Sequence, residues 1–360
     1  MMMLTAQIAT AFAADLNVFS SGEVADPSAV NANFDTLMRL ARNQQHQGSF
    51  YRINCSNDNN ALLDAVSQGE TLIEVEAGPC LANMGRVGDG PPIVGDLYIK
   101  GVGAQKPRIY TTDDADGAQY LGGKNGSIII ENVSFEGSIV SMDSAASFTA
   151  RDSDIRCQDD KTQAKIRGYQ IAVYLNGGTG ALARSTVTNC RGPAILLDSG
   201  AHLNATDSII EVPAAASDLS FPQGFTLRSA SSAVVDRTTI GGTGSSHQGE
   251  IPIYVENADI TLRQSTIKGT AVVDRASTFT VRGSNYRWPD SDSINVVVVT
   301  NDSSFFGIDS QFERTTIKNS FGATWDPSSK IYLISNNTLT HSKLTLIAGS
   351  DKLSCQSRGL

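Results

Sequence analysis

The most constraining feature of this sequence is a short pattern that recurs nine times between Ile130 and Leu344. It reads apolar or small, two variable residues, a small residue that is usually Ser or Thr, one variable residue and an apolar residue, as in Ile130–Phe135 and Leu182–Val187. Successive copies end between 19 and 32 residues apart, about 26 on average, which is a spacing typical of solenoid proteins. Most of the 360 residues are therefore expected to form one elongated array of repeats rather than several globular domains.

The repeats alternate apolar and polar residues as β-strands do, and show no helical period. Ile253–Val255 and Ile331–Leu333 are examples, and Gly, Asn and Asp stand at the bends between such runs. Each unit is expected to hold two short strands around a bend, a small polar corner and a third, very short strand. Because one coil cannot bury its apolar side alone, alternate residues must point into a core shared by all coils. The sequence therefore predicts an all-β, single-stranded parallel β-helix whose Ser and Thr corners stack between coils and bond the turn backbone.

The segment that opens the coils resembles a known family. The residues that carry the resemblance are Ile53-Asn54-Cys55, the amphipathic Asn60–Val66, Gly69, Leu72–Val75 and Gly78-Pro79-Cys80. They are similar to the N-terminal cap of right-handed parallel β-helix proteins of the pectate-lyase-like superfamily, in its secreted bacterial type. The resemblance implies a right-handed solenoid over residues 50–350, closed by a short capping helix that covers the otherwise open end of the core. Gly-His-Gly, Asn-Thr-Asp and Arg-Ile-Lys, as in polygalacturonases, are absent, so the resemblance implies the fold and not an activity.

The two ends of the chain are expected to lie outside the solenoid. Residues 1–14 are mostly apolar and close with Ala11-Phe12-Ala13, a small-x-small pattern that signal peptidase accepts. Because no basic residue precedes Arg39, we interpret them as a truncated signal peptide, with an ordinary apolar tail as the alternative. Residues 15–49 form a leader in which Asp26-Pro27 begins an amphipathic helix that either docks on the cap or mediates oligomerisation. Residues 351–360 form a C-terminal tail.

The cysteines indicate disulfides rather than a metal site. They are Cys55, Cys80, Cys157, Cys190 and Cys355, and none lies in a CxxC or Cys/His pattern that would hold zinc. In an exported protein Cys55 is expected to pair with Cys80 and Cys157 with Cys190. The second pair is also favoured by the repeats, because both residues follow a repeat end by two or three positions and so belong on neighbouring coils. The role of Cys355 stays open.

Charge and hydropathy exclude two classes of partner. The formal net charge of −9 argues against nucleic acid as a ligand, and no apolar run is long enough to predict a membrane span. With the leader and the expected disulfides, this favours a secreted or cell-surface protein.

Outward residues of the first strand in each coil provide the candidate site. The expected outward pairs are Tyr174 and Asn176, Leu196 and Asp198, Thr226 and Arg228, Tyr254 and Glu256, Val272 and Asp274, Val298 and Thr300, and Tyr332 and Ile334. Because adjacent rungs lie about 4.8 Å apart, Asp198, Arg228, Glu256 and Asp274 are predicted to form a continuous row, which we call the charge ladder. This row contains the candidate catalytic residues.

The charge ladder permits three kinds of role. Glu256 and Asp274, one rung apart, approach the carboxylate separation of retaining glycosidases, and Asp198 with Glu256, two rungs apart, approaches that of inverting ones. In a uronate lyase Arg228 would act as base or charge clamp while the acids held Ca²⁺; no other cofactor or metal is predicted. A solvated row of salt bridges with a purely structural role explains the same residues.

Aromatic residues beside the charge ladder are candidate sugar contacts. Tyr174 and Tyr254, with Tyr332, are expected on the strand face, and Trp288 and Asp290 lie on the loop of residues 287–293. A tryptophan beside an acid can stack a sugar ring while the carboxylate bonds its hydroxyls, although Trp288 packing its own loop is equally compatible. The second tryptophan, on the expected loop of residues 313–329, has the same two interpretations.

The sequence thus predicts an extracellular β-helix protein that binds a polysaccharide along its outer strand face. One alternative is a polysaccharide lyase or glycoside hydrolase that uses the charge ladder. Another is a tailspike-like or adhesin-like surface protein. The oligomeric states considered are a monomer and a homotrimer formed through the N-terminal helix.

Overall fold

The structure is a computed structural model, and its description covers part of the chain. It describes residues 50–85, 95–112, 120–124, 126–157, 171–188, 192–212, 223–242, 251–287, 295–321, 324–325 and 328–345. By its internal contacts the chain divides into Met1–Phe50 and Tyr51–Leu360, and all described strands belong to the second unit. The expected signal peptide, leader and tail lie outside the described residues, so those boundaries stay predictions. Among the helices of the described part, none is long and apolar enough to cross a membrane.

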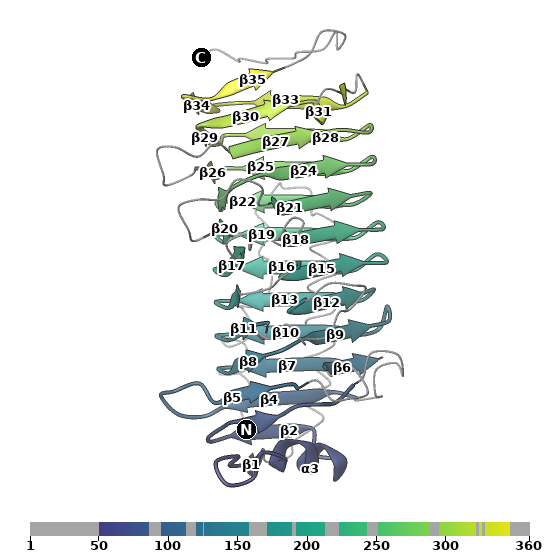
Figure 1. The fold of residues 1–360 in the computed structure, drawn as a ribbon, viewed down its shortest axis with the longest axis vertical. Coiled ribbons are helices and arrows are strands. Elements are labelled where there is room, and N and C mark those ends of the chain that lie inside the picture. Colours follow the sequence, from purple (N-terminus) through teal and green to yellow (C-terminus); the bar gives the residue numbers. More distant parts are fainter. Residues whose placement is uncertain are drawn as a thin grey trace, which may run out of the picture. The chain divides into compact units, whose positions relative to one another are not determined.

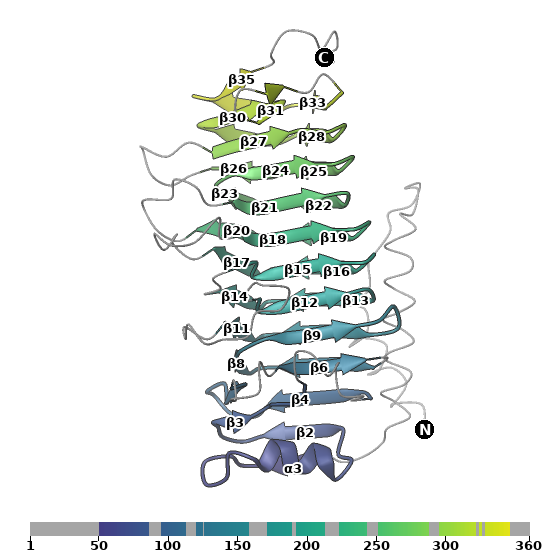
Figure 2. The ribbon, with the colours of Figure 1, turned by 45° about the vertical axis from the view of Figure 1, so that its right-hand side comes forward.

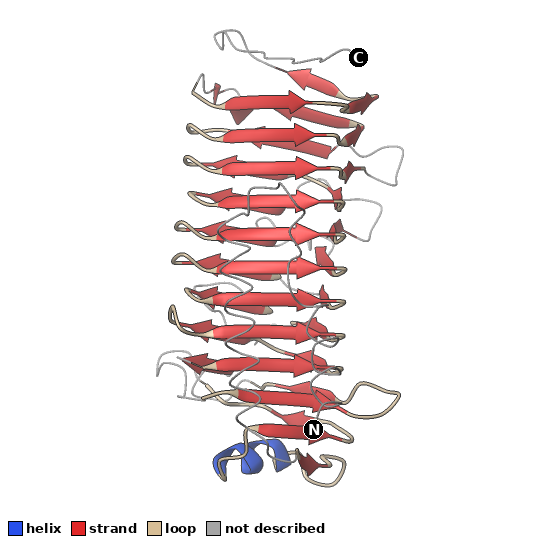
Figure 3. Ribbon diagram, turned by 180° about the vertical axis from the view of Figure 1, so that it is seen from behind, coloured by secondary structure: helices blue, strands red, loops and turns tan. Residues whose placement is uncertain are grey.

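Parallel strands make up almost all of the described fold (Figure 3). From β4 to β30 every third strand joins the same sheet, so the chain winds through three sheets in turn and builds a right-handed parallel β-helix, as the sequence predicts (Figure 1). The 12-stranded sheet contains β1 Tyr51–Ile53, β2 Leu72–Val75, β4 Leu97–Gly101, β7 Ser127–Glu131, β10 Ser147–Arg151, β13 Thr179–Ala183, β16 His202–Thr206, β19 Ser232–Asp236, β22 Asp259–Arg263, β25 Thr278–Arg282, β28 Ser304–Ile308 and β33 Lys330–Ile334.

The other two large sheets repeat this arrangement. The 11-stranded sheet contains β3 Cys80–Leu81, β5 Arg108–Tyr110, β8 Ser134–Glu136, β11 Asp154–Arg156, β14 Thr186–Thr188, β17 Ile209–Val212, β20 Thr239–Gly242, β23 Thr266–Lys268, β26 Asn285–Tyr286, β29 Gln311–Glu313 and β34 Thr338–Thr340. The 10-stranded sheet contains β6 Leu121–Lys124, β9 Ile139–Met142, β12 Val173–Asn176, β15 Ile195–Asp198, β18 Gln223–Arg228, β21 Ile251–Glu256, β24 Ala271–Asp274, β27 Asn295–Val299, β30 Thr315–Lys318 and β35 Lys343–Thr345. A short antiparallel pair, β31 Ser320–Phe321 and β32 Thr324–Trp325, stands apart from them.

The core is one stack of inward side chains that runs through every coil. On β21, Ile253 and Val255 are fully buried in this core, whereas Tyr254 between them points outward and is only partly covered. This is the period-2 pattern expected of a strand with one face in the core. The inward and outward assignment made from the sequence is therefore confirmed for this strand.

Small polar residues form a continuous hydrogen-bonded row at the corner between the 12-stranded and 11-stranded sheets. The row consists of Ser153, Ser185, Ser208, Thr238, Ser265, Ser284 and Ser310. The backbone N–H of Ser185 donates to Oγ of Ser208 at 3.2 Å, and the same Oγ donates to the carbonyl of Thr206 at 2.7 Å. Each hydroxyl thus satisfies backbone groups of two coils, which explains why Ser and Thr recur at this position.

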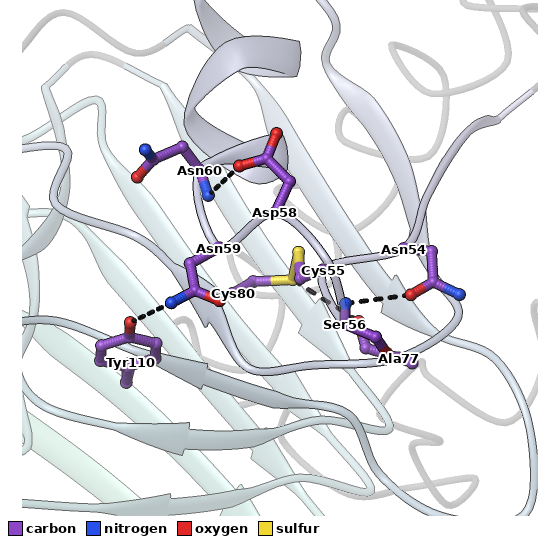
Figure 4. Close-up of a disulfide and its surroundings, with 9 residues drawn as sticks. All are labelled: Asn54, Cys55, Ser56, Asp58, Asn59, Asn60, Ala77, Cys80 and Tyr110. Atoms are coloured by element: carbon purple, nitrogen blue, oxygen red, sulfur yellow. Dashed lines mark hydrogen bonds between the residues drawn. A yellow bond between two sulfur atoms is a disulfide. The ribbon is translucent and has the colours of Figure 1, made fainter.

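A helix closes the first coil, as the resemblance implied, and a disulfide lies beside it (Figure 4). Helix α3 spans Ala61–Ser67 and buries Leu62 and Ala65, and its start is held by Asp58, whose Oδ1 accepts the backbone N–H of Asn60 at 3.0 Å. The disulfide joins Cys55 to Cys80, which confirms the first predicted pair.

Of the second predicted pair, the structure describes only one cysteine. Cys157 is buried and engaged in a disulfide. Cys190 lies outside the described residues, so the pairing of these two cysteines stays a prediction.

The last coil differs from the prediction in register. Leu339, not Leu344, follows Phe312 in the 11-stranded sheet, and Leu344 instead pairs with Ile317 in the 10-stranded sheet. The sequence reading placed residues 313–329 in a loop, but this stretch contains β30, a strand too polar to be recognised by its pattern. Because β30 was not predicted, the strand residues that follow it were assigned to the wrong sheets.

Candidate functional site

The charge ladder is present in the register that the sequence predicts. Arg228 pairs with Glu256, and Glu256 with Asp274, on adjacent strands. Asp198 follows Leu197, whose partner is Leu227, so Asp198 precedes Arg228 in the same row. The strands that carry these residues lie one above another in the 10-stranded sheet (Figure 2).

The charge ladder borders a surface hollow of about 580 Å³, which we call the ladder hollow. Its described lining consists of Asp198, Arg228, Ser229, Glu256, Asn257, Arg275, Ala276 and Asn301. Three of these residues were predicted from the strand pattern. The other five belong to the turns that follow β18, β21, β24 and β27, whereas the candidate residues were predicted on strands and long loops. Four of them lie one or two positions after a strand that ends in Arg228, Glu256 or Asp274, and this position is the signal that could have found them.

Glu256 is the centre of the ion pairs in the ladder hollow. Its Oε2 lies 3.3 Å from Nε of Arg228, and its Oε1 is paired with Nη1 of Arg275. The Glu256 side chain is 16% exposed, against 29% for Arg228 and 67% for Arg275. Glu256 therefore holds one guanidinium from a strand and one from a turn.

The other two carboxylates of the charge ladder are held differently. Oδ1 of Asp274 accepts hydrogen bonds from the backbone N–H of Arg275 at 3.0 Å, from Thr300 Oγ1 at 3.1 Å and from the side-chain amide of Asn301. Asp274 thus fixes the turns around it and does not line the hollow. Asp198 is 3% exposed, and its Oδ1 accepts the backbone N–H of Ser199 at 2.8 Å.

The turns that line the ladder hollow have left-handed backbone at residues other than glycine. Ser229, Asn257, Arg275, Ala276 and Asn301 all have φ between 50° and 56°. This conformation disfavours side chains and is usually occupied by glycine. In the two preceding coils the equivalent turns contain glycine at Gly177, Gly178 and Gly200, beside the left-handed Ser199. The ladder hollow is therefore lined by side chains that are kept at some conformational cost.

Tyr254 lies beside the hollow rather than in its lining. The guanidinium carbon of Arg228 is 5.9 Å from the centre of the Tyr254 ring, so Arg228 covers part of one ring face. Burial raises the pKa of Tyr254, and the nearby carboxylates of Glu256 and Asp274 raise it further. The hydroxyl is therefore protonated at neutral pH, but stacking of a sugar on this ring stays a prediction.

Tyr174, predicted as a sugar contact, is buried. It is 2% exposed and packs with Tyr120, Val140, Ile171 and Leu196 in a small apolar cluster on the outer face of the 10-stranded sheet. The residue points away from the coil, as predicted, but other side chains cover it. It therefore supports the sheet from outside and cannot stack a ligand in this state.

Two of the remaining aromatic candidates belong to strands outside the 10-stranded sheet. Tyr332 belongs to the 12-stranded sheet, where its ring stacks on Phe306 with centroids 4.8 Å apart. Trp325 is part of β32 and pairs with Ser320. Trp288 and Asp290 lie outside the described residues.

A second hollow continues the same edge of the sheet toward the N-terminus. It has a volume of about 440 Å³, and its described lining is Lys124, Met142, Asp143, Ser144, Asn176, Gly177 and Ser199. Lys124, Met142, Asn176 and Asp198 are register partners in succession, so this row leads directly into the charge ladder. Oδ1 of Asn176 is buried and has no hydrogen-bond partner among the described residues.

The described side chains offer no metal-binding cluster. No group of three or more His, Cys, Asp or Glu side chains in the described residues could hold an ion. What the ladder hollow does present is a set of paired charges, amides and a hydroxyl on rigid strand ends. Such a surface can form hydrogen bonds with a polar ligand that lies across several rungs.

Comparisons with known proteins find similar solved structures only. No protein-family model matches the chain, and no curated protein sequence is significantly similar to it. The A-module of a mannuronan C-5 epimerase from Azotobacter vinelandii aligns with a TM-score of 0.39 and 12% identity over 80% of this chain and 92% of the other. The Dettilon tailspike protein aligns with a TM-score of 0.37 and 9% identity, over 88% and 71%. A pectate lyase variant from Xanthomonas campestris aligns with a TM-score of 0.29 and 12% identity, over 85% and 83%.

Proposed function

We propose that this protein is an extracellular polysaccharide-binding β-helix, and that the polysaccharide lies along the charge-ladder edge of the 10-stranded sheet. The observation that carries the proposal is the row from Lys124 to Asp274, which is polar except at Met142 and has a hollow at each end. Rungs about 4.8 Å apart offer contacts at intervals close to the length that one pyranose adds to an extended chain. The Cys55–Cys80 disulfide supports an oxidising, extracellular setting.

The bonds that the ladder carboxylates already make favour a binding function over a catalytic one. Glu256 is committed to two guanidinium groups, and Asp274 accepts bonds from three donors of the surrounding turns. A glycosidase needs one carboxyl group as acid and another as base or nucleophile, both facing the scissile bond. Here the bonds of Asp274 are directed to its own turns, so the arrangement supports a binding surface better than a catalytic pair.

The test is retention of the full chain on a panel of immobilised polysaccharides. Arg275→Ala removes an exposed wall of the ladder hollow and is expected to weaken binding roughly tenfold, the effect of one charge-assisted hydrogen bond. Arg237→Ala is the matched control, because Arg237 is also an exposed arginine paired with an acid, Asp207, but lies at another corner of the coil. Equal retention of both variants and the unchanged protein would place the binding surface elsewhere.

The same panel tests the enzyme alternative. Reducing ends and unsaturated products are measured for each polysaccharide, with added calcium and with chelator. Unsaturated products would identify a lyase, new reducing ends without them a hydrolase, and retention without products a binding protein.

A further inference from the structure

The ladder hollow also indicates which class of polysaccharide it takes. We infer that its ligand is a neutral polysaccharide and not a polyuronate or other anionic chain; this inference rests on the proposed function. Three features of the described residues carry it: the charge balance of the lining, the partners of the two arginines, and the kind of polar groups that remain for a ligand.

Among the described residues, the lining of the ladder hollow is formally neutral. It contains two acids, Asp198 and Glu256, and two arginines, Arg228 and Arg275. The described lining of the second hollow has one lysine and one acid, Lys124 and Asp143. An anionic chain with a charge on every sugar therefore meets no net positive field along this edge, whereas surfaces that attract polyanions carry an excess of basic groups.

Both arginines of the ladder hollow already have a carboxylate partner. A sugar carboxylate that bound Arg228 or Arg275 would either be repelled by Glu256, which lies 3.3 Å from Nε of Arg228 and is paired with Arg275, or displace it from them. Because Glu256 is only 16% exposed, losing its partners would leave a largely desolvated carboxylate without compensation, which is costly. A hydroxyl group can instead bond to an ion pair without breaking it, because it donates to the carboxylate and accepts from the guanidinium.

The polar groups that remain suit hydroxyls. Ser229 and Asn257 bring a hydroxyl and an amide into the ladder hollow, on left-handed turns where glycine would be less strained. A hydroxyl and an amide can each donate and accept, as the hydroxyls of a neutral sugar do, whereas a carboxylate can only accept.

The experiment compares neutral and anionic polysaccharides on the full chain at low and high salt. The neutral probes are dextran, galactomannan and xyloglucan, and the anionic probes are polygalacturonate and alginate. We expect the protein to be retained on at least one neutral probe. This retention should be the same at about 50 mM and at about 500 mM NaCl, because binding without net charge is not screened by salt. Polyuronate retention that is stronger than neutral retention and falls with salt would overturn the inference while leaving the proposed function intact. No retention on any probe would overturn both.

A charge-matched pair of variants makes the test specific. Glu256→Gln removes one negative charge from the ladder hollow at nearly unchanged shape, and should weaken neutral binding roughly tenfold while creating salt-sensitive retention of polyuronates. Asp207→Asn makes the same charge change at a remote corner, where Asp207 is bonded by Arg237 at 2.7 and 2.9 Å, and should change neither. Thermal unfolding confirms that both variants are folded. Identical behaviour of the two variants would overturn the inference.

Discussion

At the scale of the residue, the same core position can carry different side chains at different costs. Ile267, Tyr286 and Phe312 succeed one another in the 11-stranded sheet and all point into the core. Tyr286 alone of the three has a hydroxyl, and that hydroxyl is buried without a hydrogen-bond partner among the residues that the structure describes. Burial also raises the pKa of Tyr286, so its hydroxyl stays protonated. The buried hydroxyl therefore destabilises the fold locally, and the packing of the Tyr286 ring against Phe312 compensates for this.

Tyr286→Phe is expected to stabilise the protein by up to about 1–3 kcal/mol, because it removes a buried polar group that has no partner. The change is measured as the free energy of unfolding in urea. Tyr98→Phe is the control, because the Tyr98 hydroxyl donates to Glu131 at 2.6 Å and its loss should destabilise. A decrease in stability for Tyr286→Phe as large as that for Tyr98→Phe would mean that the Tyr286 hydroxyl does find a partner.

At the scale of the element, strands were predictable and turns were not. The alternation in Ile253–Val255 predicts which residues enter the core, and the Ser and Thr corners follow from a repeat visible in the sequence. β30 has no such alternation of strongly apolar residues, and it was missed. The turn residues Asn257 and Arg275 were missed for another reason: the candidates were predicted on strands and long loops, and the left-handed backbone of Arg275 is not one that local preference predicts.

The polar corner row provides the prediction at this scale. Ser208→Ala leaves the backbone N–H of Ser185 without its acceptor in a buried position, so we expect a loss of about 1–3 kcal/mol of stability. Ser208→Thr is the control, because Thr238 fills the same position one coil later and makes the same bonds. Thermal unfolding of both variants checks this. Equal stability of the Ala and Thr variants would mean that the row of hydroxyls does not contribute to stability.

At the scale of the whole molecule, each coil is stabilised mainly by its neighbours. A solenoid of this kind depends on its ends, because a terminal coil has a neighbour on one side only. At the N-terminal end, α3 covers the core and the Cys55–Cys80 disulfide ties β3 to the segment that follows β1. This closure prevents the first coils from separating.

Replacing both cysteines of this disulfide with alanine is expected to cost about 3 kcal/mol, the value for a closed loop of this length; the two residues are 25 positions apart. The melting temperature should fall, and limited proteolysis should begin in the first coils. Cys355→Ala, which removes a cysteine with no predicted partner, should change neither measurement. Peptide mapping without reductant should also recover Cys55 bound to Cys80 and Cys157 bound to Cys190. Recovery of free thiols at these four positions would contradict the prediction.

The sequence by itself determined the solenoid, the inward faces of most strands, the first disulfide and the order of the charge ladder. These depend on a period of two within strands and on a repeat between coils, and both are written in the order of the residues. Tertiary structure alone decided that Tyr174 is covered, that Tyr332 lies on another sheet, and that Arg275 reaches Glu256 from a turn. These outcomes depend on how residues from different coils meet in space: an outward side chain is exposed only if no other segment packs over it, and a turn side chain finds its partner only once the coils are stacked.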